Sequence, residues 1–203
     1  QAAGFLAARR VETEAGISEV RYQPLGPLLA VMPWNFPFWQ VFRFAAPALM
    51  AGNTALLKHA SNVQGSAQAM ESLFLEAGFE EGVFQNLAIS SDRVAGVIAH
   101  SAIRAVTLTG SEAAGMSVAA EAGKHLKKCV LELGGSNAFV VLSDADLDLA
   151  LQTAMTARLQ NGGQSCIAAK RFILDSEIAA DFISGLEERV AGIVSGDPMM
   201  EET

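Results

Sequence analysis

The chain contains little cysteine and comparatively few basic residues. Only Cys129 and Cys166 occur among its 203 residues, and neither belongs to a CxxC pair, so the sequence offers no disulfide framework and predicts no metal site. Unpaired thiols are typical of a reduced, cytoplasmic protein. Because 22 acidic residues outnumber 14 lysines and arginines, the net charge of −8 argues against nucleic acid or an anionic membrane surface as a partner. An anionic cofactor is compatible with this charge, since backbone dipoles can bind one locally.

Targeting and membrane signals are also lacking. The sequence has no basic stretch followed by a short apolar run, and no apolar run long enough to cross a bilayer. We therefore expect no membrane partner. The chain does not start with methionine and it ends on MMEET, and we interpret it as part of a longer protein.

What the sequence does contain is a regular alternation of apolar runs and helical stretches. Apolar residues make up 51% of the chain, enough for a sizeable core. Strands that alternate with helices through short links predict an α/β protein with a doubly wound, mostly parallel sheet. We expect strands over 18–23, 28–32, 54–58, 83–87, 103–109, 129–133, 138–142 and 169–174, and helices over 1–16, 38–50, 63–77, 92–100, 111–122, 146–160 and 178–193.

The alternation breaks near Gly134 and Gly135, where two expected strands follow one another. Such a break is typical of a change from one packed unit to the next. We therefore place a domain boundary there, with one domain over 1–134 and a second over 135–203.

Cys166 stands directly after a polar, glycine-rich stretch, NGGQS. A buried structural thiol needs no such stretch, whereas a nucleophile benefits from it. Glycines let a substrate approach, and nearby backbone N–H groups can stabilise both a thiolate and an oxyanion. Cysteine is also among the most buried residue types, so a structural thiol remains an alternative for Cys166. It is the preferred interpretation for Cys129, which lies in the apolar run KKCVLEL.

Three further segments place polar groups at the ends of expected strands. Glu132 in LELGG lies at the carboxyl edge of the sheet, where open α/β folds bind ligands. Beside a catalytic cysteine it could activate water against a thioester; alone it is an exposed acid. In PWNFP the prolines could hold Asn35 as a hydrogen-bond donor, or Trp34 could simply fill a turn. TGSEAAG, over 109–115, opens a helix whose small residues would let a pyrophosphate approach, although it is not GxGxxG.

Together, five motifs in this order resemble the aldehyde dehydrogenase superfamily: PWNFP, AGNTALLKHA, TGSEAAG, LELGGSNAF and NGGQSCIAAKRF. The resemblance implies a cofactor-binding domain over 1–134 and the start of a catalytic domain over 135–203. It implies that the Cys166 thiolate attacks the aldehyde carbonyl. Asn35, with the backbone N–H of Cys166, would form the oxyanion hole. Glu132 would be the base that activates water, and its presence favours release of a carboxylic acid over transfer to coenzyme A.

The resemblance also implies a nicotinamide cofactor. Lys58 would bind the adenosine ribose, Gly110 and Ser111 would cover the pyrophosphate, and Trp34 would line the pocket. Many NAD-preferring relatives carry a glutamate at the position of Ser61, which would repel a 2′-phosphate. Because Ser61 is neutral and can donate a hydrogen bond, we expect NADP or NAD to be used, with NADP favoured.

Substrate choice depends on Arg43, in the otherwise apolar segment VFRFAAPALM. An arginine there is costly unless it is paired or lies at a cavity mouth, and the alternative is a side chain whose head stays in water. In succinate-semialdehyde dehydrogenases an arginine at this place binds the distal carboxylate. We therefore expect succinate semialdehyde or a similar ω-oxo acid as substrate.

Other interpretations stay open at this point. The chain could belong to an aldehyde dehydrogenase for a neutral aldehyde, to a non-catalytic nucleotide-binding module, or to a thiol esterase on the same scaffold. The resemblance further implies that the full-length protein is a homo-oligomer, either a dimer or a tetramer.

Overall fold

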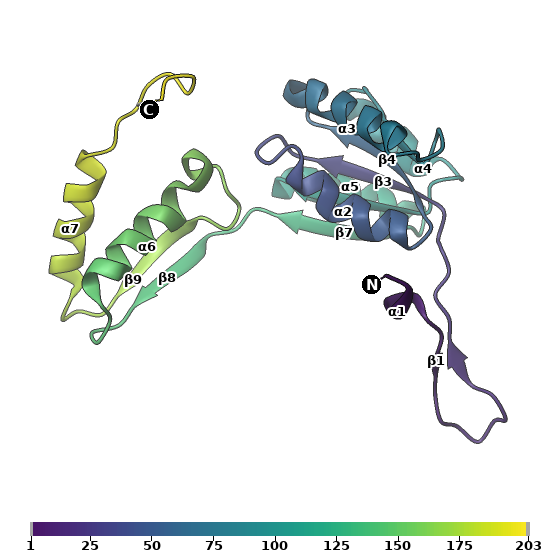
Figure 1. The fold of residues 1–203 in the computed structure, drawn as a ribbon, viewed down its shortest axis with the longest axis horizontal. Helices are drawn as coiled ribbons and strands as arrows, with labels where there is room; N and C mark the ends of the chain where they lie inside the picture. Colours follow the sequence, from purple (N-terminus) through teal and green to yellow (C-terminus); the bar gives the residue numbers. More distant parts are fainter. Residues whose placement is uncertain (1, 202–203) are drawn as a thin grey trace. The chain divides into compact units, whose positions relative to one another are not determined.

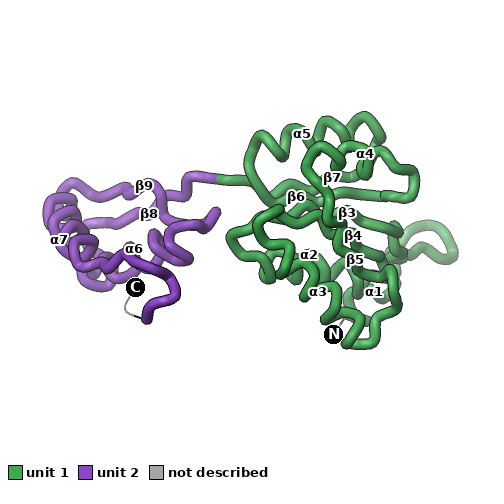
Figure 2. Tube along the Cα trace, turned by 90° about the horizontal axis from the view of Figure 1, so that it is seen from above, with its two compact units in different colours: residues 1–134 green, residues 135–203 purple. Residues whose placement is uncertain are grey.

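The structure is a computed structural model that describes residues 2–201. The chain divides into two compact units, residues 1–134 and 135–203 (Figure 2). Unit 1 contains a five-stranded sheet in the order β5-β4-β3-β6-β7, in which all neighbouring strands are parallel. The strands are β3 (Pro27–Met32), β4 (Thr54–His59), β5 (Phe84–Asn86), β6 (Ala105–Gly110) and β7 (Lys128–Leu133).

Helices cover both faces of this sheet (Figure 1). Successive side chains of β3 point to opposite faces, so Ala30 packs with α2 and α3, whereas Leu29 packs with α4 and α5. Both residues are fully buried. The helices are α2 (Trp39–Met50), α3 (Gln64–Glu76), α4 (Val94–Ala99) and α5 (Glu112–Lys124), with short 3₁₀ helices η1 (Ser61–Val63) and η2 (Ser91–Arg93). The predicted doubly wound parallel sheet is confirmed.

Helix α5 approaches β7 very closely at Gly115. A Cβ atom at this position would lie 2.6 Å from a methyl carbon of Leu133, so any side chain here would require the Leu133 side chain or the helix to shift. The helix begins at Ser111, whose Oγ accepts a hydrogen bond from the N–H of Ala114 at 3.3 Å. The cap therefore marks where the helix starts, and the glycine lets the helix pack closely on Leu133.

The predicted helix over 1–16 is wrong beyond Leu6, and residue 1 lies outside the described residues. Helix α1 (Ala2–Leu6) is followed by a small antiparallel hairpin of β1 (Arg9–Arg10) and β2 (Glu19–Val20). The hairpin is closed by a bond from Val11 N–H to the carbonyl of Ser18 (2.9 Å) and by a contact of 2.6 Å between the hydroxyls of Thr13 and Ser18. This intervening segment has no helical period of apolar residues, which explains why the helix does not continue.

Unit 2 is a smaller α/β unit around a two-stranded parallel sheet. It contains β8 (Asn137–Val141), α6 (Leu147–Leu159), the 3₁₀ segment η3 (Gln160–Gly163), β9 (Ala169–Leu174) and α7 (Ala179–Ala191). Its core is formed by Val141, Leu151, Ala154 and Phe182. The acidic residue Asp146 caps α6 by accepting a hydrogen bond from Leu149 N–H at 3.0 Å. Within residues 2–201, no helix is long and apolar enough to span a membrane.

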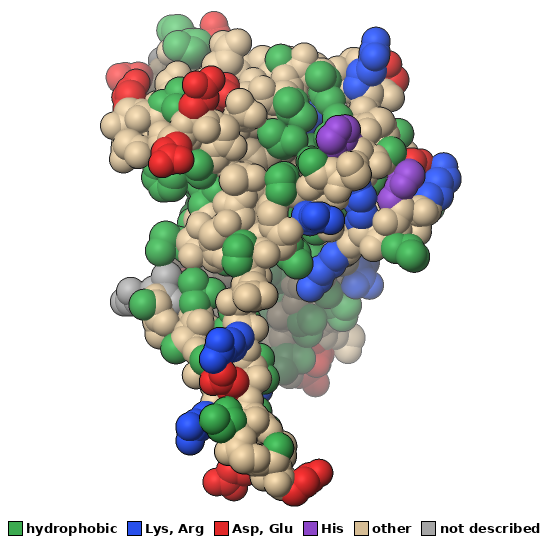
Figure 3. Space-filling view, turned by 90° about the vertical axis from the view of Figure 1, so that its right-hand side faces the viewer, with side chains coloured by type: hydrophobic (Ala, Val, Ile, Leu, Met, Phe, Trp, Pro, Cys, Tyr) green, Lys and Arg blue, Asp and Glu red, His purple; other side chains and the backbone are tan. Residues whose placement is uncertain are grey.

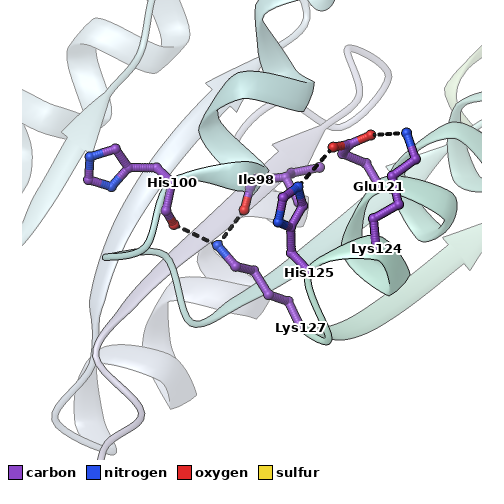
Figure 4. Close-up of polar contacts among 6 residues, drawn as sticks. All are labelled: Ile98, His100, Glu121, Lys124, His125 and Lys127. Carbon is purple, nitrogen blue, oxygen red and sulfur yellow. Dashed lines mark hydrogen bonds and ion pairs between the residues drawn. The ribbon is translucent and has the colours of Figure 1, made fainter.

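A polar cluster joins the end of α5 to the end of α4 (Figure 4). The ammonium of Lys127 donates to the carbonyls of Ile98 and His100, which end α4. Glu121 accepts from Lys124 Nζ at 2.8 Å and contacts His125 Nε2 at 3.1 Å. Histidine and basic side chains gather on this face of unit 1 (Figure 3). The cluster lies at the amino ends of the strands, directly before β7. The predicted site residues lie at the opposite, carboxyl ends.

The Glu121 cluster predicts a pH dependence of stability. The hydrogen bond from Lys124, with help from His125, holds the pKa of Glu121 below its ordinary value of 4.5. Because the folded-state pKa is the lower one, this stabilisation is complete above about pH 4.5 and is lost as the pH falls through the folded-state pKa. We expect Glu121→Gln to lower Tm at pH 7, with a difference from wild type that disappears in acid. Calorimetry across pH measures this difference. In a Lys124→Met background, Glu121→Gln should lower Tm by less than it does in wild type.

Candidate active site

Four predicted site segments lie at one edge of the unit 1 sheet, because they follow or end parallel strands. PWNFP follows β3, Lys58 lies near the end of β4, Gly110 ends β6, and Glu132 lies near the end of β7. The chain winds from β3 toward β5 on one side and continues with β6 and β7 on the other. Open α/β sheets bind ligands at the carboxyl edge where the winding direction changes. This edge is therefore the candidate active site of unit 1.

The PWNFP turn is fastened to the sheet by His59, which the sequence reasoning missed. This side chain is fully buried. Its Nε2 lies 2.9 Å from the carbonyl of Pro37, which can only accept, so Nε2 donates. Its Nδ1 lies 3.0 Å from Ala60 N and 3.2 Å from the carbonyl of Met32, which ends β3. The alternation along β4, where Ala55, Leu57 and His59 are all buried, is the signal that could have revealed this residue.

We expect His59→Ala to destabilise the protein by about 3 kcal/mol, because it opens a cavity at a fully buried side chain and removes the donor to the partly buried carbonyl of Pro37. Urea unfolding measures this. The matched control is His100→Ala. This histidine is exposed and its Nδ1 accepts a hydrogen bond from Ala102 N–H at 3.2 Å, so we expect a loss of less than about 1 kcal/mol. Equal losses for both variants would contradict the anchoring role of His59.

Arg43 of α2 forms an ion pair with Glu132 of β7. The Nη2 and Oε1 atoms are 3.5 Å apart, and the two side chains are 47% and 56% exposed. An ion pair this exposed contributes only about 0–1 kcal/mol to stability. Its importance is its location: it joins the residue predicted to bind a substrate carboxylate to the residue predicted to activate water.

The same ion pair borders a cavity of about 570 Å³ between α2 and the adjacent face of β3, β6 and β7. The wall supplied by α2 is mostly apolar, with Phe44, Pro47 and Ala48, and the wall supplied by the sheet carries Thr107, Thr109 and Val130. The cavity is thus a largely apolar space with a cation and an anion at its border.

Cys166 lies in unit 2, whereas the other predicted site residues lie in unit 1. The loop before it turns sharply, since Asn161, Gly162 and Gly163 all have positive φ (55°, 62° and 76°). A Cβ atom at Gly163 would lie 3.2 Å from the carbonyl oxygen of Arg158, so a glycine suits both the conformation and the space.

The loop ends in a tight turn that presents the thiol. Ser165 is buried, and its carbonyl accepts from Ala168 N–H at 3.2 Å, which leaves Cys166 exposed. Cys129 is half-buried in β7, and burial raises the pKa of its thiol. An exposed thiol is what a nucleophile needs, and a thiol with a raised pKa is a poor one, so the predicted roles of Cys166 and Cys129 are compatible with these positions and stay predictions.

The end of the LELGGS motif is held next to β9. Lys170 Nζ donates to the carbonyl of Gly135 at 2.5 Å, and Arg171 Nε donates to that of Ser136 at 3.1 Å. These bonds tie the entry of unit 2 to the strand that follows the Cys166 turn. No group of three or more His, Cys, Asp or Glu side chains within residues 2–201 could hold a metal ion.

Comparison with known proteins decides the family. The model of the aldehyde dehydrogenase family matches residues 2–203. The chain belongs to the aldehyde dehydrogenase family. It is 56% identical over 199 residues to the probable succinate-semialdehyde dehydrogenase [NADP(+)] of Synechocystis sp., covering 98% of this chain and 44% of that protein. It is 55% identical over 183 residues to succinate-semialdehyde dehydrogenase [NADP(+)] 1 of Mycobacterium tuberculosis, covering 90% of this chain and 40% of that protein.

Solved structures agree with the sequence comparison. The fold matches succinic semialdehyde dehydrogenase from Streptococcus pyogenes, in complex with NADP+, with a TM-score of 0.96 and 46% identity over 100% of this chain and 44% of that one. A salicylaldehyde dehydrogenase from Pseudomonas putida G7 matches with a TM-score of 0.92 and 32% identity, over 97% of this chain and 42% of that one. The predicted membership of the aldehyde dehydrogenase family is confirmed, and the chain spans less than half the length of these relatives.

The residues of unit 1 fit the nicotinamide cofactor that an aldehyde dehydrogenase implies. At Gly110 the nearest atom to a built Cβ is a Leu108 methyl carbon at 3.6 Å, so the backbone is open to a pyrophosphate at the start of α5. The carboxylate of Glu112, in the first turn of α5, is unfavourable for an anionic pyrophosphate at this position. Lys58 is half-buried, Ser61 is exposed, and Trp34 is 47% exposed, so all three side chains have accessible surface at this edge.

Proposed function

We propose that the native protein carrying this chain is a succinate-semialdehyde dehydrogenase that oxidises an ω-oxo acid to the dicarboxylic acid. The observation that carries the proposal is the Arg43–Glu132 pair at 3.5 Å on the border of one cavity. A guanidinium in this position can bind a distal carboxylate through two parallel hydrogen bonds. The names of the relatives from Synechocystis and Mycobacterium support the same substrate.

In the proposed mechanism the Cys166 thiolate attacks the aldehyde carbon, and the carbonyl oxygen becomes an oxyanion. The Asn35 amide and the backbone N–H of Cys166 stabilise that oxyanion. A bound nicotinamide supplies the hydride acceptor, and loss of the hydride leaves a thioester on Cys166. Glu132 removes a proton from water as the water attacks the thioester, so that the carboxylic acid leaves and the thiol is restored.

We propose NADP as the favoured cofactor, with NAD also accepted. Lys58 would bind the ribose, Gly110 and Ser111 would cover the pyrophosphate, and Trp34 would line the pocket. The neutral hydroxyl of Ser61 is exposed next to the end of β4, where a glutamate would repel a 2′-phosphate. The two free thiols favour a reducing, cytoplasmic setting, and the homo-oligomer stays a prediction from the family resemblance.

Steady-state kinetics of Arg43→Ala test the substrate assignment. We expect KM for succinate semialdehyde to rise about 100-fold, because a charge-assisted pair worth about 2–3 kcal/mol is lost. For butanal, which has the same carbon chain and no carboxylate, KM should change less than about threefold. Arg93→Ala, at an exposed residue on η2, is the matched control.

Three outcomes of this assay would overturn parts of the proposal. An equal KM increase for both aldehydes would exclude carboxylate recognition by Arg43. A kcat/KM for NAD more than about tenfold above that for NADP would exclude the cofactor preference, since tenfold corresponds to 1.4 kcal/mol. Absence of turnover with either cofactor would favour the non-catalytic nucleotide-binding module.

A further inference from the structure

Ser61 lies just beyond the end of a strand, whereas Lys58 lies within it. Lys58 is paired with Val31 in the parallel register of β4 and β3, and the last pair of that register joins His59 to Met32. The sheet therefore fixes the position of Lys58. Ser61 begins η1, two residues after the last pair, and is exposed. Its position depends on how the two residues between it and Lys58 are held.

The side chain of Gln64 binds both of these intervening residues. Gln64 is the first residue of α3 and is half-buried. Its Nε2 donates to the carbonyl of His59 at 3.3 Å and to the carbonyl of Ala60 at 3.2 Å. Because carbonyls can only accept, these contacts determine the orientation of the carboxamide. One side chain thus holds the backbone between Lys58 and Ser61.

The other end of the Gln64 carboxamide is fixed by a neighbouring strand. Asn86 ends β5, the strand next to β4, and its Nδ2 donates to Gln64 Oε1 at 3.3 Å. The N–H of Val63 donates to the same carbonyl of Ala60 at 3.2 Å and closes the turn around Ser61. With both ends of its carboxamide bound, Gln64 ties the turn to the ends of two parallel strands.

We propose that Gln64 is a positioning residue for cofactor selection, which holds the turn so that the Ser61 hydroxyl meets the 2′-phosphate of NADP. This inference rests on the proposed function, in which Lys58 binds the ribose and Ser61 accommodates NADP. A loop held in its bound conformation gains affinity, because it loses less freedom when the ligand binds.

The gain from Gln64 falls on NADP rather than on NAD. Only NADP carries the 2′-phosphate, and a hydrogen bond from a hydroxyl to an ionised phosphate is stronger than one to a neutral hydroxyl. Lys58, by contrast, is fixed by its pairing with β3 and serves the ribose of either cofactor. Loosening the turn should therefore weaken the binding of NADP selectively.

The test is calorimetric titration of the native protein with NADP and with NAD, which needs no substrate and no turnover. Gln64→Met keeps the length of the side chain and removes all three of its hydrogen bonds. We expect Kd for NADP to rise about tenfold and Kd for NAD to stay within about twofold. The matched control is Gln68→Met, at an exposed glutamine one turn further along α3, which should leave both Kd values unchanged.

A double variant shows whether Gln64 acts through Ser61. In a Ser61→Ala background, Gln64→Met should raise Kd for NADP by less than about twofold, since the group that it positions is gone. A further rise of about tenfold in this background would overturn the inference. Equal rises of Kd for NADP and NAD in the single variant would also overturn it, because Gln64 would then support the whole cofactor site without selecting between cofactors.

Failure of this inference is distinguishable from failure of the proposed function. If Ser61→Ala weakens the binding of NADP while Gln64→Met does not, the inference fails and the proposed cofactor site stands. If wild type binds NAD more tightly than NADP, or if Ser61→Ala leaves both Kd values unchanged, the proposed cofactor preference fails and the inference fails with it.

Discussion

Cys166→Ala in the native protein is expected to lower kcat for aldehyde oxidation by at least about 10⁴-fold, as removal of a catalytic nucleophile generally does. In the proposed mechanism hydride leaves only from the tetrahedral adduct on the Cys166 sulfur. Alanine cannot form that adduct. Because Cys166 is exposed at the end of a turn, the substitution removes no packed side chain, and the fold should be retained. Progress curves at 340 nm measure the loss, and circular dichroism checks the fold.

Cys129 provides the matched control, since the sequence contains only these two cysteines. It is half-buried, packs against the core between the sheet and α5, and has a thiol pKa raised by burial. Cys129→Ala should therefore keep kcat within about twofold and cost about 1 kcal/mol of stability. Iodoacetamide should modify Cys166 first, and inactivation should follow that modification.

A Cys166→Ala protein that still oxidises aldehyde would exclude this nucleophile. Ester hydrolysis that persists without any nucleotide and depends on Cys166 would instead favour the thiol esterase alternative. The two results differ in the cofactor requirement, so assays of wild type and variant with and without nucleotide decide between them.

Regular elements were the most predictable part of the molecule. The strand over 169–174 has the predicted bounds, and α2 begins one residue after the predicted start at Phe38. Helix α2 is a long, mostly apolar segment that ends at a glycine signal, and such segments are the easiest to predict from sequence. The helix expected over 1–16 failed because this segment has no apolar face to pack, so the hairpin bonds between Thr13, Ser18 and their neighbours decide its shape.

The residues of the candidate site were predictable only where they match family motifs. The roles assigned to Asn35, Lys58 and Cys166 come from that resemblance. Contacts between distant segments were not predictable. Periodicity can place Gln40 and Arg43 on one face of α2, but it cannot say that Glu132 of β7 stands opposite. Similarly, a histidine at the end of β4 gives no sign of its bond to Pro37 until the turn is folded over it.

The expected result for Glu132→Gln is a burst without sustained turnover. Reduced cofactor should appear rapidly, about one equivalent per site, and then accumulate about 10²–10⁴-fold more slowly than in wild type, which is the usual contribution of a general base. Glutamine keeps the shape of the side chain but cannot take a proton from water. The thioester on Cys166 still forms, because hydride transfer precedes the step that Glu132 serves. Stopped-flow absorbance resolves the two phases.

The same variant tests the partnership with Arg43. Without the Glu132 carboxylate, the Arg43 guanidinium is no longer partly neutralised, so succinate semialdehyde should bind more tightly. Because the pair is about half-exposed, the gain is limited to about fivefold, equivalent to at most about 1 kcal/mol. Binding of butanal should not change. Succinate titration by calorimetry isolates this effect from the altered kinetics.

Glu188→Gln removes an equal charge from an exposed position on α7 and should behave like wild type in both measurements. A linear progress curve at the wild-type rate for Glu132→Gln would show that another group activates the water. A slow phase with no burst would show that Glu132 acts before hydride transfer, for example by activating the thiol. A burst together with tighter succinate binding would assign both roles to the one carboxylate: base for the water, and competitor of the substrate for Arg43.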